Sequence, residues 1–99
     1  MACGPAAGAA RAAEIDLATQ AIIQGTVVQD DRPARRAYVR LLDGTGEFVA
    51  EVTTGASGDF RFFAAPGSWT VRVLAAHAAP VESTVSAAVG AVTEVELTL

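Results

Sequence analysis

The sequence has no lysine, a single histidine and a single cysteine, and these scarcities exclude several kinds of chemistry. Without lysine the chain can form no Schiff base and cannot hold a nucleotide phosphate as a P-loop does. A single cysteine excludes an internal disulfide, and one cysteine with one histidine cannot complete a structural zinc site. We therefore expect no metal and no cofactor, and a reducing compartment.

Positive charge is also scarce. Seven basic residues face eleven acidic ones, which leaves a net charge of -4 at pH 7. Nucleic-acid binding needs a concentrated basic surface, so this charge balance argues against a nucleic-acid partner. The local basic group Arg32, Arg35 and Arg36 stands beside Asp30 and Asp31, which is typical of a solvated loop of mixed charge.

Long hydrophobic runs are missing as well. No run approaches the roughly 18 apolar residues that a membrane helix needs. Residues 1–20 are alanine-rich but lack the basic start and leucine-rich segment of an export signal. We expect a cytoplasmic protein with no membrane partner, in which residues 1–20 form a flexible or weakly helical tail and residues 21–99 form one domain.

From residue 21 the chain consists of β-branched and aromatic runs, separated by Gly, Pro and Asp about every ten residues, as in all-β sandwiches. In "SWTVRVLA", Trp69, Val71 and Val73 fall on one face, and Thr70 and Arg72 fall on the other. The pattern predicts an all-β fold, a seven-stranded antiparallel Greek-key sandwich. The expected strands are 21–28, 37–42, 48–54, 60–64, 68–76, 81–87 and 92–99.

The connections between these strands carry residues typical of turns. Residues 43–46, "DGTG", and 55–59, "GASGD", supply glycines that accept a positive φ, and Pro66 with Gly67 suits the centre of a type II turn. The sequence therefore predicts three hairpins in series.

The aromatic residues have two interpretations. Phe60, Phe62, Trp69, Val71 and Val73 fit a hydrophobic core, because such rings supply most of the burial that a small domain needs. Phe63 falls on the opposite face of its strand. The second interpretation is a ligand-binding aromatic platform, and we favour the core.

If all strands are antiparallel, alternate loops gather at one end of the sandwich. This end would collect Asp31, Arg35, Arg36, Asp59 and His77 as a binding site or a weak hydrolase centred on His77 and Asp59. Surface loops of β-sandwiches collect such residues without a function, which is the interpretation we prefer. No regular oxygen spacing for calcium is present.

Cys3 is the one reactive side chain. A thiolate there could accept sulfur or contact a partner, although no neighbouring Lys or His in the sequence lowers its pKa. The simpler interpretation is an incidental thiol.

The segment "GDFRFFAAPGSWT", residues 58–70, with "GTVV", "AYVRLLD" and a closing valine-rich strand, resembles the carboxypeptidase regulatory-like family, whose fold is the transthyretin-like (prealbumin-like) sandwich. Within that group the chain is most similar to the small actinobacterial SseC-like proteins of unknown function, from about residue 22 to the C-terminus. Those proteins are commonly encoded beside a thiosulfate sulfurtransferase of the rhodanese type. The resemblance therefore implies an accessory role in sulfur metabolism.

The same fold includes enzymes whose site residues are missing here. Hydroxyisourate hydrolases use paired histidines and a Tyr-Arg-Gly-Ser ending, and intradiol dioxygenases bind iron with two tyrosines and two histidines. This chain has only Tyr38 and His77 and ends in "VELTL". We therefore expect neither enzymatic activity in this chain.

We therefore expect a non-enzymatic accessory protein that binds a thiosulfate sulfurtransferase, with Cys3 as contact or sulfur acceptor. The alternatives are a small-ligand or carbohydrate-binding module that uses Phe63 or Trp69, and the weak hydrolase. A homo-oligomer stays open, because edge strands of a sandwich can pair, although Glu94 and Glu96 on the last strand discourage this.

Overall fold

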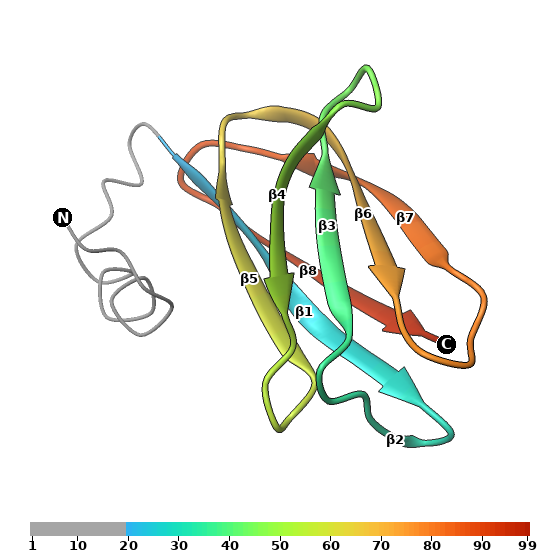
Figure 1. Cartoon of the computed structure of the whole chain (residues 1–99). Coiled ribbons are helices and arrows are strands. Elements are labelled where there is room, and N and C mark those ends of the chain that lie inside the picture. Colours follow the sequence, from blue (N-terminus) through green and yellow to red (C-terminus); the bar gives the residue numbers. More distant parts are fainter. Residues whose placement is uncertain (1–19) are drawn as a thin grey trace, which may run out of the picture.

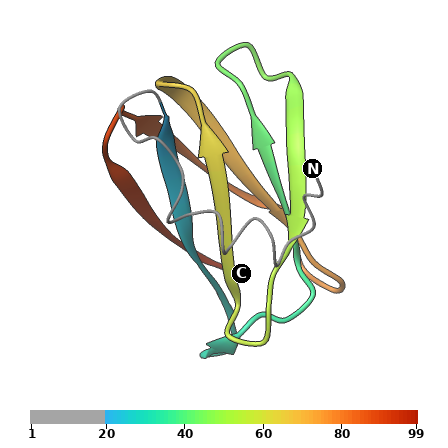
Figure 2. The ribbon, with the colours of Figure 1, turned by 90° about the vertical axis from the view of Figure 1, so that its left-hand side faces the viewer.

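The computed structural model describes residues 20–99, which form two β-sheets packed face to face (Figures 1 and 2). Sheet A contains β1, β2, β5 and β8, and sheet B has the order β4-β3-β6-β7. The strands are β1 (Ala21–Gln29), β2 (Arg32–Pro33), β3 (Tyr38–Leu42), β4 (Phe48–Thr53), β5 (Asp59–Ala64), β6 (Gly67–Leu74), β7 (Val81–Ala87) and β8 (Val92–Thr98). The all-β sandwich predicted from the sequence is confirmed.

Two details of the predicted topology are wrong. β8 pairs with β1 in the parallel direction, from Ile22 opposite Val92 to Val28 opposite Thr98, so sheet A is not wholly antiparallel. The pair joins the two ends of the domain, so no hairpin fixes its direction. The short β2 adds an eighth strand, paired antiparallel with β1. The two-residue turn between β1 and β2 places Asp30 and Asp31 at φ 55° and 62°, as a type I′ hairpin turn requires.

Only one of the three expected hairpins forms, between β3 and β4. The connection from β4 to β5 and the connection from β5 to β6 each cross from one sheet to the other. A turn signal in the sequence fixes where the chain reverses, but it does not fix which strand lies beside the next one. At the second crossing Gly67 has φ 138°, a conformation that side chains rarely adopt.

The core lies between the two sheets and follows the alternation of each strand. Phe60, Phe62, Val71 and Val73 are buried in it, with the Phe60 and Phe62 ring centroids 6.0 Å apart. Trp69 is half-buried and packs against this core, and its indole Nε1–H donates a hydrogen bond of 2.9 Å to the carbonyl oxygen of Ala65. Trp69 therefore lies at the margin of the core, with its polar edge satisfied by a hydrogen bond.

Gly25 allows β8 to approach β1 closely. A Cβ atom at this position would collide with the carbonyl oxygen of Val95 on β8 and press on the Phe60 ring. The glycine therefore maintains the contact between β1 and β8, on which the outer face of sheet A depends.

Candidate functional site

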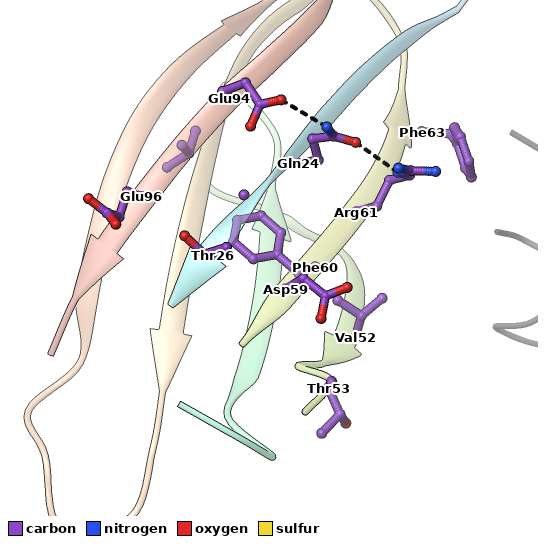
Figure 3. A pocket seen from close by; sticks show the side chains of 13 residues that line it. Gln24, Thr26, Val52, Thr53, Asp59, Phe60, Arg61, Phe63, Glu94 and Glu96 are labelled. Atoms are coloured by element: carbon purple, nitrogen blue, oxygen red, sulfur yellow. Dashed lines mark hydrogen bonds between the residues drawn. The ribbon is translucent and has the colours of Figure 1, made fainter. Parts of the chain in front are cut away.

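An open groove crosses the outer face of sheet A and continues to the end of β4 (Figure 3). Its cavity volume is about 760 Å³. Side chains on the solvent side of β8, β1 and β5 line it, and Val52, Thr53 and Gly55 close it on the β4 side. The outward side chains in the groove are Gln24, Thr26, Asp59, Arg61, Phe63, Glu94 and Glu96.

A chain of hydrogen bonds spans the middle of the groove. The Arg61 Nε–H on β5 donates to Gln24 Oε1 on β1 at 2.8 Å. The Gln24 Nε2–H in turn donates to Glu94 Oε2 on β8, also at 2.8 Å (Figure 3). The two bonds orient the Gln24 amide and link three strands by side chains as well as by the backbone.

The bonding of these groups leaves donors and acceptors free for a ligand. Arg61 uses its Nε–H on a neutral amide, and a guanidinium has five N–H donors. Asp59 and Glu96 are exposed and flank Thr26 on either side. The groove can therefore accept hydrogen bonds from a positively charged group and donate hydrogen bonds to an anionic or carbonyl group.

The loop residues predicted as a site lie at one end of the sandwich, where β1 ends, β5 begins and β6 leads into β7 (Figure 1). Among them only Asp59 lines the groove. Asp31, Arg35, Arg36 and His77 are exposed on three different turns, with Arg35 and Arg36 in the same one. Asp31, Arg36 and His77 take a positive φ of about 60°. The shared end was foreseen, but the fold does not assemble these side chains around one point.

The structure offers little support for a catalytic centre at this end. Within residues 20–99, no side-chain hydrogen bond joins His77 to a carboxylate or a hydroxyl group. The same residues contain no group of three or more His, Cys, Asp or Glu side chains placed to hold a metal ion. No helix in this part of the chain is long and apolar enough to cross a membrane.

Sequence reasoning missed most of the groove. Gln24 and Glu94 lie on strands that the sequence predicted, but their partnership depends on the parallel register between β1 and β8. Arg61 lies on the exposed face of β5, between the buried Phe60 and Phe62. Its contact with Gln24 depends on the pairing of β5 with β1, which the sequence did not predict. Phe63 lies at the groove, outside the core, as its position in the strand indicated. Cys3 lies outside the described residues.

Comparison with known proteins places the chain among uncharacterized relatives. Residues 3–99 match the family described as "Protein of unknown function (DUF1416)". The uncharacterized proteins Rv0814c and Rv3118 of Mycobacterium tuberculosis are each 53% identical over 77 residues, which is 77% of either chain. An uncharacterized protein of Mycolicibacterium smegmatis is 57% identical over 63 residues, 63% of this chain and 70% of that protein.

Among solved structures, a DUF3823 family protein from Parabacteroides merdae superposes with a TM-score of 0.57 at 14% identity, over 82% of this chain and 46% of that one. A 9R-lipoxygenase from Cyanothece has a TM-score of 0.52 at 13% identity, over 86% of this chain and 17% of the enzyme. At such identities these likenesses show the sandwich fold alone.

Proposed function

The chain belongs to the DUF1416 family of proteins of unknown function, and we propose that it is a non-enzymatic, cytoplasmic accessory protein of sulfur metabolism. Its resemblance to the SseC-like proteins supports this assignment. The proposed partner is a thiosulfate sulfurtransferase of the rhodanese type.

The observation that carries a binding role is the groove on the outer face of sheet A. It combines an ordered row of hydrogen-bonding side chains with exposed carboxylates and one outward-facing aromatic ring, Phe63. The rigid sheet beneath holds these groups at fixed spacings. Such a surface suits recognition of a protein, and we assign it to the sulfurtransferase.

In this proposal Cys3 accepts sulfur from the bound partner. The Cys3 thiolate attacks the outer sulfur of the partner's cysteine persulfide, a new S–S bond forms at Cys3, and the partner's cysteine leaves as a thiolate. One sulfur atom moves and no external oxidant or reductant is needed.

Purification of the C-terminally tagged full-length chain from its native cytoplasm tests this function, followed by intact mass analysis. We expect the wild type to co-purify a sulfurtransferase and to carry one additional sulfur atom. Cys3→Ser should keep the fold and lose the added mass, whereas Ala2→Ser, which alters the neighbouring position but keeps the thiol, should retain it. Equal masses for wild type and Cys3→Ser would remove the sulfur-acceptor role, and failure to recover a sulfurtransferase would remove the partner.

A second candidate is a small-ligand or carbohydrate-binding module, because the groove volume of about 760 Å³ is within the range of ligand sites. Phe63 would provide the apolar contact. Trp69 is a poor candidate for this role, since it packs on the core and its indole N–H is already bonded. Saturable perturbation of the Phe63 and Gln24 amide signals by a sugar or metabolite would favour this alternative.

A further inference from the structure

The outer face of sheet A is organised in three rows that run across β8, β1 and β5. The registers of the β1–β5 and β1–β8 pairs place three residues side by side in each row. The rows are Val92, Ile22 and Phe63; Glu94, Gln24 and Arg61; and Glu96, Thr26 and Asp59. One end of the face is therefore apolar, the middle is a hydrogen-bonded row, and the other end is acidic.

The acidic end differs from the opposite side of the sandwich. On the outer face of sheet B each glutamate is paired, Glu51 with Arg40 and Glu82 with Arg72, at 2.8 Å. On sheet A three carboxylates accompany one guanidinium, and within residues 20–99 no ion pair neutralises Asp59, Glu94 or Glu96. This face therefore carries an excess of negative charge that favours a cationic partner.

The geometry at the acidic end suits one basic side chain. Thr26 is short and lies between Glu96 and Asp59. Neighbouring strands are about 4.8 Å apart, so the strand positions of Asp59 and Glu96 lie roughly 10 Å from each other, with Thr26 between them. A guanidinium or ammonium group above Thr26 would lie roughly 5 Å from either strand position, where both negative charges attract it, without displacing an existing ion pair.

Phe63 is four residues along β5 from Asp59, which corresponds to about 13 Å along the strand. Phe63 is half-buried and lines the groove, whereas Val92 in the same row is 46% exposed. The apolar contact and the cation site are therefore too far apart for one small polar molecule. Their separation matches side chains four residues apart in an extended peptide.

We propose that this groove binds a protein segment that presents one basic and one aliphatic side chain about 13 Å apart, the basic one between Asp59 and Glu96 and the aliphatic one on Phe63. The proposal deepens the proposed function, because it gives the chemistry of the sulfurtransferase segment that the groove recognises. The exposed carboxylates of the groove resemble the polar rim of a protein interface more closely than a pocket that encloses its ligand.

The test is a titration of the full-length, isotope-labelled chain with a capped peptide of sequence TLTSTRT, followed by amide NMR signals. Its Leu and Arg are four residues apart and share one face when extended. We expect perturbations at Thr26, Asp59 and Phe63, and affinity that falls about tenfold in Asp59→Asn with Glu96→Gln. Glu82→Gln on the outer face of sheet B is the matched control and should bind like the wild type.

Two control peptides check the spacing and the charge. Replacing Arg by Gln, or moving it one residue closer to Leu so that the two side chains face opposite ways, should weaken binding about tenfold. Equal affinity for all three peptides, or equal affinity of the Asp59→Asn, Glu96→Gln variant and the wild type, would overturn the proposal. Groove signals that shift with protein concentration alone would overturn it in favour of a second copy. Contacts from residues 1–19 that block the peptide would overturn it in favour of the chain's own N-terminal segment.

The outcomes separate this inference from the proposed function. If the double variant still recovers the sulfurtransferase as well as wild type does, the groove assignment fails while the accessory role stands. If the peptide binds as expected but no sulfurtransferase is recovered, the groove assignment stands and the accessory role fails.

Discussion

At the scale of single residues, Asp43 organises the turn between β3 and β4. Its Oδ1 accepts hydrogen bonds from the backbone N–H of Thr45 at 2.9 Å, the Thr45 hydroxyl at 2.7 Å and the backbone N–H of Glu47 at 3.0 Å. These bonds favour the carboxylate over the carboxylic acid. The Thr45 hydroxyl is the largest cause that lowers the pKa of Asp43 below the usual 3.8, followed by the backbone N–H of Glu47.

This arrangement predicts a loss of turn stability in acid. The pKa of Asp43 is lower in the folded chain than in the unfolded one. The contribution of Asp43 to the stability of the turn is therefore complete above pH 3.8 and is lost as the pH falls through the pKa of the folded chain. A carbon-13 NMR titration should give a pKa below 3.8 for the wild type and a higher pKa for Thr45→Val, which lacks the hydroxyl. An identical Asp43 pKa in both proteins would contradict this account.

At the scale of elements, Thr54 joins the end of β4 to the connection between β2 and β3. Its hydroxyl donates to the carbonyl oxygen of Ala34 at 2.6 Å and accepts from the backbone N–H of Ala37 at 2.9 Å. Thr54 is 4% exposed and is the one buried polar residue in the described part of the chain. The side chain therefore satisfies backbone groups of a connection that has little secondary structure of its own.

Removal of this hydroxyl should destabilise the domain. Thr54→Val keeps the shape but leaves a buried N–H and C=O unpaired, which costs about 2 kcal/mol in the free energy of unfolding. Thr54→Ser retains the hydroxyl and should lose less, about 1 kcal/mol for the missing methyl group. Urea unfolding of the three proteins measures both differences. Wild-type stability in Thr54→Val would show that the two hydrogen bonds of the hydroxyl contribute nothing to the free energy of unfolding.

The elements also show how far the sequence alone could lead. Strand positions followed from alternation, because a half-buried strand needs it. The predicted ends of the strands differ from the observed ends by at most two residues, as for the predicted strand 68–76 and the observed β6 (Gly67–Leu74). The pairing of the strands was harder to predict from the sequence, since the β1–β8 pair depends on packing between residues about 70 positions apart. The row Glu94, Gln24 and Arg61 follows from that pairing and could not be assembled without it.

At the scale of the whole molecule, the two sheets share one core. Ile23 and Val27 from sheet A pack in the same buried cluster as Leu41 and Val71 from sheet B. A sheet with one unprotected apolar face is not stable in water, so neither layer is expected to persist without the other. The domain should unfold in a single transition.

Trp69 in sheet B can report a change made in sheet A. Ile23 is 0% exposed on β1, and Ile23→Val removes one methyl group at a cost of about 1 kcal/mol. In urea, Trp69 fluorescence and far-ultraviolet circular dichroism should give coincident curves for the wild type, and the variant should shift both midpoints equally. Val71→Ala on β6 is the reciprocal change and should also move the two signals together. A Trp69 transition that stays in place in Ile23→Val would mean that sheet B folds independently, and the groove on sheet A would then be free to open without disturbing the rest of the molecule.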